Sequence, residues 1–68
     1  MHVGSIIKKL QQDNGVSCVA LSESLGVAPQ QLSRWRNAKD LKLSIVIKVA
    51  DVFGLGLNEF INYGKEAN

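Results

Sequence analysis

The sequence has few of the residues from which covalent frameworks and metal centres are built. It contains one cysteine, one histidine and one proline among 68 residues. A single cysteine cannot form an internal disulfide or supply the four thiolates of a structural zinc site. The one histidine, His2, stands near the terminus without an acid or thiol nearby to complete a metal or catalytic site. We therefore expect no metal, no cofactor and no enzyme activity.

Long hydrophobic runs are also missing. The most apolar stretch, Ile45 to Phe53, is interrupted by Lys48 and Asp51 and is far shorter than the roughly 20 residues of a membrane-spanning helix. Polar residues follow Lys8 and Lys9, where a secretory signal would have its apolar region. The glycines are scattered and form no phosphate-binding loop. We expect a cytoplasmic protein without a membrane partner or small-molecule ligand.

The composition is that of one small folded domain, residues 1–68. Hydrophobic residues make up 46% and charged residues 21%, a globular balance. A chain of this length buries only about 60% of the surface of its unfolded form, so a deep substrate cavity is not expected.

Apolar residues recur at helical spacing, and glycines separate the segments. Val3, Ile6, Ile7 and Leu10 form one such stripe. The sequence predicts an all-α fold of five short helices: from Val3 to about Asn14, between Ser17 and Gly26, from Pro29 to Asn37, between Asp40 or Ser44 and Gly54, and from Leu57 to Tyr63, followed by a frayed tail at about 64–68. Ser17 is the expected cap of the second helix and Asp40 or Ser44 that of the fourth, whereas Ala28 offers the third helix no cap.

The segment 18–37, CVALSESLGVAPQQLSRWRN, has the pattern of a helix-turn-helix formed by helices two and three. Ser22 is small, as the closest approach of two crossing helices requires, and Gly26 can adopt the positive φ of the turn. The expected core of this motif comprises Leu21, Ser22, Leu25, Gly26, Val27, Leu32 and Trp35.

The third helix has a polar outer face. On a helical wheel Leu32 and Trp35 share one side. The opposite side carries Gln30, Ser33, Arg34 and Asn37, with Gln31 and Arg36 at its edges. Glutamine can bind adenine and arginine can bind guanine through paired hydrogen bonds, so this face suits the reading of base edges.

The modest net charge of +2 conceals a polarised distribution. Between residues 28 and 48, five basic residues and one acidic residue give +4, and the remaining three basic and five acidic residues give −2. A positive region around the third helix attracts phosphate and makes binding dependent on salt.

The chain resembles the lambda-type Cro and repressor (Xre-like) family of phage and bacterial regulators from about Val3 to Ile61. Gly26–Val27, the LSRW of Leu32 to Trp35 and the KVADVFGL of Lys48 to Leu55 match that family's pattern at its usual spacing. The resemblance implies base reading by Gln30 and Arg34, with Gln31 and Ser33 secondary, and phosphate contacts by Asn37, Lys39, Lys42 and Arg36. Two departures are Cys18, where the family often has a glutamine that binds phosphate, and Ser22, where alanine is usual.

The implied function is a sequence-specific regulator of double-stranded DNA, a small Cro-like repressor that occludes a promoter. A homodimer on a two-fold operator is expected, because one domain offers few base contacts. Phe60, Ile61 and Tyr63 are candidates for the dimer surface, while Leu57 and Phe60 are also candidates for the core. Two other readings stay open: a protein-interaction module with this fold, such as an antitoxin or anti-repressor, and an architectural DNA protein with little sequence preference.

Overall fold

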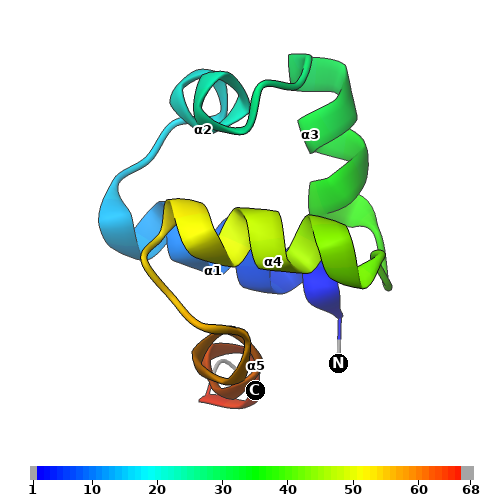
Figure 1. Cartoon of the computed structure of the whole chain (residues 1–68). Helices are drawn as coiled ribbons and strands as arrows, with labels where there is room; N and C mark the ends of the chain where they lie inside the picture. The colour runs from blue at the N-terminus through cyan, green and yellow to red at the C-terminus, as the bar shows by residue number, and fades with distance from the viewer. Residues whose placement is uncertain (1, 67–68) are drawn as a thin grey trace.

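The computed structural model describes residues 2–66, which form five α-helices and no strand (Figure 1). In chain order they are α1 (Val3–Asn14), α2 (Cys18–Leu25), α3 (Pro29–Asn37), α4 (Leu43–Val52) and α5 (Leu57–Glu66). The predicted all-α fold of five helices is confirmed.

The ends of the early helices follow local sequence signals. Ser17 caps α2, because its hydroxyl accepts a hydrogen bond from the amide of Ala20 at 3.1 Å. Gly26 ends α2 in the left-handed conformation, with φ 69°. Ala28 gives α3 no side-chain cap, and Pro29 occupies the first turn, where a missing N–H leaves no bond unmade. These three boundaries are as predicted.

The predicted cap of α4 is wrong. Neither Asp40 nor Ser44 caps the helix: Lys42 stands at the N-cap position and makes no side-chain capping bond. Ser44 lies inside the first turn instead. Leu41, in the preceding loop, packs against the core. This contact fixes the chain just before the helix, which begins at Leu43.

The predicted end of α5 is also wrong. The helix continues through residues 64–66, which we expected to belong to a frayed tail, and residues 67 and 68 lie outside the described part of the chain. Gly64 is buried, and the hydroxyl of Tyr63 donates a hydrogen bond to the carboxylate of Asp13 in α1. Packing against α1 therefore extends the helix past the point where glycine alone would favour its end.

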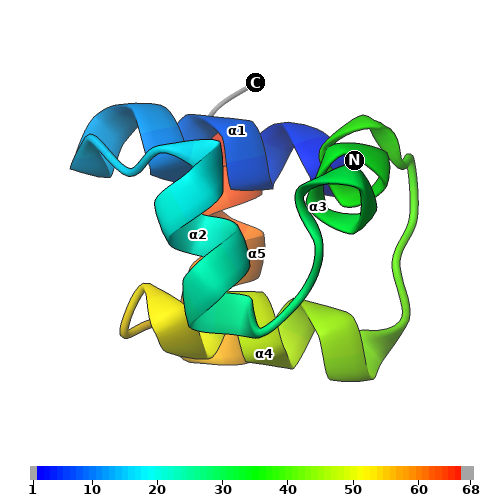
Figure 2. The ribbon, with the colours of Figure 1, turned by 90° about the horizontal axis from the view of Figure 1, so that it is seen from above.

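The helices enclose a single core. α1 and α4 run along opposite sides of the domain, and α2 on one face and α5 on the other bridge them, while α3 stands at one end (Figures 1 and 2). Every helix contributes to the buried cluster of Ile6, Ile7, Leu10, Leu21, Leu25, Leu32, Trp35, Val46, Val49, Ala50 and Phe60. Each fully buried Val, Leu, Ile or Phe side chain stabilises the folded state by about 1.5–3 kcal/mol relative to an exposed one.

A glycine contact fixes α3 against α1. The amides of Val3 and Gly4 donate to the carbonyls of Lys39 and Ala38 at 3.0 and 2.9 Å. A Cβ atom at Gly4 would lie 2.3 Å from the backbone oxygen of Arg36, so only glycine fits there. The start of α1 thus holds the end of α3 in place.

Candidate nucleic-acid interface

The helix-turn-helix is built from α2, the turn at Gly26 and α3. The structure buries Leu21, Ser22, Leu25, Leu32 and Trp35, half-buries Val27 and places Gly26 in the turn. Ser22 is 2% exposed, and its hydroxyl is satisfied by the carbonyl of Val19 at 2.9 Å. The amide of Val27 donates to the carbonyl of Ser22 at 3.0 Å and closes the turn. The two helices are therefore held against each other by side-chain packing, and a backbone hydrogen bond closes the turn that joins them.

The outer face of α3 is open. Gln30, Gln31, Ser33 and Arg34 are all exposed, whereas Leu32 and Trp35 on the inner face are 0% and 8% exposed. No described residue covers the outer face. Its side chains present amide, hydroxyl and guanidinium groups to solvent, which are the groups that bind base edges in a major groove.

Asn37 is held by two partners at the end of α3. Its amide nitrogen donates to the carbonyl of Ser33 at 2.9 Å, and its side-chain oxygen accepts a bond from Lys8 Nζ at 3.2 Å. Lys8 belongs to α1 and was not among the predicted site residues. The bond brings a further positive charge to the end of α3, beside the predicted phosphate contacts.

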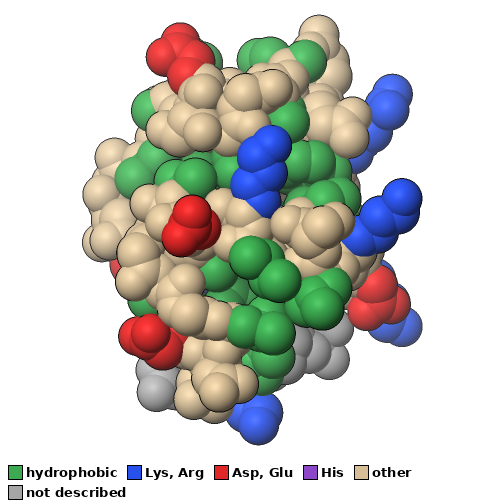
Figure 3. Space-filling model, in the orientation of Figure 1, with side chains coloured by type: hydrophobic (Ala, Val, Ile, Leu, Met, Phe, Trp, Pro, Cys, Tyr) green, Lys and Arg blue, Asp and Glu red, His purple; other side chains and the backbone are tan. Residues whose placement is uncertain are grey.

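Lys39 and Lys42 lie in the loop after α3 and are exposed. The loop backbone is pinned to α1 at Lys39, so its position relative to α3 is defined. In Figure 3, Lys and Arg side chains gather along the edge formed by α3 and this loop, and most acidic side chains in view lie towards the other edge. The charge separation seen in the sequence is thus a surface property.

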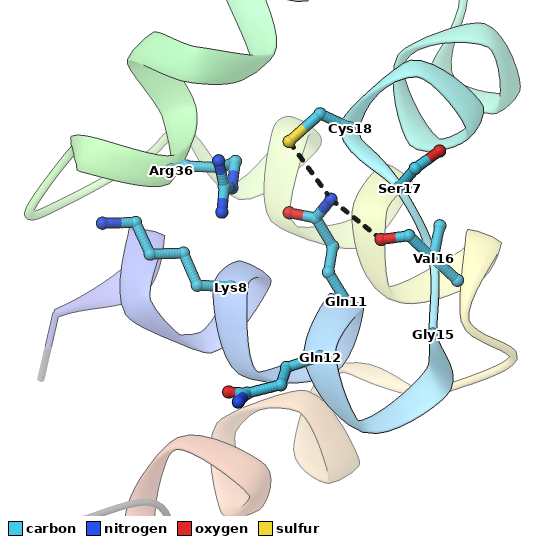
Figure 4. Close-up of a pocket in the computed structure, with 8 residues that line it drawn as sticks. All are labelled: Lys8, Gln11, Gln12, Gly15, Val16, Ser17, Cys18 and Arg36. Atoms are coloured by element: carbon cyan, nitrogen blue, oxygen red, sulfur yellow. Dashed lines mark hydrogen bonds between the residues drawn. The ribbon is translucent and has the colours of Figure 1, made fainter.

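Arg36 differs from the other predicted phosphate contacts because it is half-buried. Its Nε atom is buried and, among the described residues, has no hydrogen-bond partner. The side chain lies in an open hollow with a volume of about 620 Å³, between α1, the start of α2 and the end of α3 (Figure 4). Cys18, at the position where the family often has a glutamine, lines the same hollow.

One of the predicted dimer residues is corrected by the structure. Phe60 is 1% exposed and belongs to the core, so it is not available to a partner; its position on the inner side of α5 explains this. Ile61, Tyr63 and Leu57 are half-buried. The large apolar side chains with the greatest exposure lie on other helices: Val19, Leu43, Ile47 and Val52.

Neither a metal centre nor a membrane-spanning helix is found among the described residues. Residues 2–66 hold no group of three or more histidine, cysteine, aspartate or glutamate side chains that could bind a metal ion. Within the same range, none of the helices combines the length and apolar character needed to cross a membrane.

The polar face of α3 is open to solvent, and a turn at Gly26 joins this helix to α2. Together with the other three helices, this arrangement defines a helix-turn-helix domain of the DNA-binding type. The helix-turn-helix family model matches residues 7–60, so the chain belongs to the helix-turn-helix family of Xre, Cro and lambda-repressor type. The chain is accordingly a DNA-binding helix-turn-helix regulator that acts on double-stranded DNA. No curated protein and no solved structure matches it.

Proposed function

We propose that the chain is a small Cro-like repressor that binds a specific operator and occludes a promoter. The observation that supports this most strongly is the exposed face of α3 opposite the buried Leu32 and Trp35. Gln30 and Arg34 read base edges in the major groove, with Gln31 and Ser33 as secondary contacts. No step requires catalysis, and the site of action is the bacterial cytoplasm, where the regulated DNA lies.

The phosphate contacts come from the end of α3 and the loop that follows. Lys39 and Lys42 are exposed and long enough to reach the backbone on either side of the groove. Asn37 contributes through the amide hydrogen that its bond to Ser33 leaves free. Arg36 contributes its guanidinium from the hollow beside α2.

We propose that the repressor binds as a homodimer on a two-fold operator. Ile61 shares an apolar groove with Leu43 and Leu57, and Ile47 is exposed on the same helix as Leu43. An apolar surface of this kind suits a second copy, and two copies double the number of base contacts. Tyr63 is a weaker candidate than Ile61, because its hydroxyl already binds Asp13.

Selection of bound sites from random duplexes tests this function. We expect an enriched sequence with two inverted half-sites about one helical turn, or about 10 base pairs, apart. Enrichment of a single half-site would contradict the dimer. An architectural DNA protein would bind without enriching a sequence, and a protein-interaction module would bind no duplex in a salt-dependent way.

A further inference from the structure

The hollow between α1, α2 and α3 has a basic wall beside a thiol. We call it the basic hollow and define it by Lys8, Gln11, Cys18 and Arg36, all of which line it (Figure 4). Lys8 and Arg36 supply two positive charges, and no carboxylate is found among the described residues of the lining. The hollow is open to solvent and lies outside the core.

Gln11 carries an unpaired polar atom at the basic hollow. The side chain is 5% exposed, and its nitrogen donates to the carbonyl of Val16 at 3.3 Å and to Cys18 Sγ at 3.6 Å. Its oxygen has no partner among residues 2–66, and in Figure 4 it points across the hollow towards Arg36, whose Nε is also unpaired. Buried polar atoms are nearly always paired, so an unpaired acceptor and an unpaired donor that face each other call for a group that binds them.

Cys18 is the one thiol among the residues that line the basic hollow. It is the first residue of α2, its thiol is free, and it is half-buried rather than enclosed. Partly exposed sulfur beside positive side chains is the setting in which reactive cysteines are found. The hollow therefore combines a thiol with groups that recognise carboxylates and amides.

We propose that Cys18 is a thiolation site for an anionic low-molecular-weight disulfide of the peptide type, and that the adduct weakens DNA binding. The reagent's carboxylates pair with Lys8 and Arg36, beside the unpaired oxygen of Gln11. Cys18 gives up its proton, and Sγ attacks one sulfur of the reagent. The reagent's S–S bond breaks as the mixed disulfide forms, and the other half leaves as a thiol that takes the proton. Cys18 is oxidised, and the released half is reduced.

The effect on DNA binding rests on the proposed function. Arg36 is one of the proposed phosphate contacts, and Lys8 is bonded to Asn37, another of them. An anionic adduct in the basic hollow occupies these cations and places negative charge beside the bound DNA backbone. Like charges brought together in an interface weaken binding and slow association.

Reaction with two disulfides of opposite charge tests the site itself. Oxidised glutathione serves as the anionic probe and cystamine as the cationic one, and mass spectrometry follows adduct formation. For each state of the protein, the rate of reaction with oxidised glutathione is divided by the rate with cystamine. Because Lys8 and Arg36 attract the anionic reagent, this ratio should be at least about tenfold higher in the folded protein than in urea-unfolded protein. Equal ratios in the two states would overturn the proposal.

Charge variants locate the effect. Lys8→Gln and Arg36→Gln should each lower the preference for oxidised glutathione. Lys48→Gln removes an exposed cation on α4, away from the hollow, and should leave the preference unchanged. Because Lys8 is exposed, its replacement leaves the core intact. If Lys8→Gln and Arg36→Gln both keep the wild-type preference for oxidised glutathione, then these two side chains do not attract the anionic reagent, and the proposal is overturned.

DNA binding tests the regulatory consequence. The thiolated protein should bind its operator at least about tenfold more weakly than the reduced protein, and a reductant should restore the affinity. Cys18→Ser should bind equally with and without oxidised glutathione. An adduct that leaves affinity unchanged would refute the regulation. A reduced protein with no affinity for any duplex would refute the proposed function while leaving the charge-selective thiolation intact.

Discussion

At the scale of single residues, the domain depends on a few side chains that link distant segments. Gly4 lets the backbone of α1 touch that of α3, and Lys8 bonds to Asn37, which lies 29 residues further along the chain. Both contacts join α3, in the middle of the chain, to α1 near its start. The position of α3 therefore depends on α1 as well as on the turn that precedes it.

Replacement of Gly4 by alanine should destabilise the domain by about 1–3 kcal/mol, because the new methyl group would overlap the Arg36 carbonyl. Gly56→Ala is the matched control, since a Cβ there meets only the Glu59 side chain at 3.5 Å. Urea denaturation of both variants measures the difference. Equal midpoints for the two would show that α1 and α3 do not touch in this way.

Trp35→Ala should cost about 3–5 kcal/mol, because Trp35 is 8% exposed and fills the space between α3 and the core. Gln31→Ala, on the open face of the same helix, should change stability by less than about 0.5 kcal/mol. Thermal melting followed by circular dichroism compares them. A cooperative melt of Trp35→Ala at the wild-type temperature would exclude Trp35 from the core.

At the scale of elements, the sequence predicted the helix boundaries that local residues determine and missed the contacts between segments far apart in the chain. Ser17, Gly26 and Pro29 mark helix boundaries through their own capping and turn chemistry, so these were predictable. Periodicity likewise identified the buried and open faces of α3. It cannot say which element a face meets, so the docking of Gly4 and the bond from Lys8 had no sequence signal.

The length of α5 shows the same distinction. Gly64 argues for a helix end in an isolated segment, yet packing against α1 buries it and the helix continues. Phe60 belongs to the core for the same reason, and the sequence left its place open between core and surface. Tertiary contacts, which local propensity does not contain, decided both outcomes.

The contact between α1 and α5 makes the stability of the folded domain depend on pH in the acidic range. The hydrogen bond from Tyr63 and the ion pair with Lys9 hold the pKa of Asp13 below its ordinary value of 3.8. A lowered pKa in the folded state favours folding above the unfolded pKa, and the gain is lost as pH falls below about 4. Tyr63→Phe should therefore reduce the loss of stability between pH 5 and pH 3.

A double-mutant cycle checks the origin of this effect. Asp13→Asn should reduce the acid dependence in the same way, and the combined variant with Tyr63→Phe should show no further reduction. Denaturation midpoints at several pH values supply the data. Additive effects of the two changes would mean that Tyr63 acts on stability without Asp13.

At the scale of the whole molecule, the uneven distribution of basic and acidic residues favours the binding of DNA. The basic segment 28–48 comprises α3, the loop after it and the first part of α4, and Lys and Arg side chains gather along the edge formed by α3 and that loop. Such a distribution orients the domain on a polyanion before any base is read, because phosphate attraction acts over longer distances than hydrogen bonding. Net charge alone would not have revealed this property.

Salt titration measures the number of phosphate contacts. Lys39→Gln and Lys42→Gln should each reduce the slope of log affinity against log salt by about 0.9, the value for one released counterion. Lys65→Gln removes an exposed lysine from α5 and should leave the slope unchanged. Equal slopes for all three variants would place the phosphate contacts elsewhere.

The most direct measurement compares wild type and Arg34→Ala on a selected operator and on a random duplex, at one salt concentration. Loss of a paired contact to guanine should weaken operator binding by about 1–3 kcal/mol and relax the base preference at one position of each half-site. The random duplex should lose much less. An unchanged operator affinity, or an equal loss on both duplexes, would contradict base reading by the open face of α3.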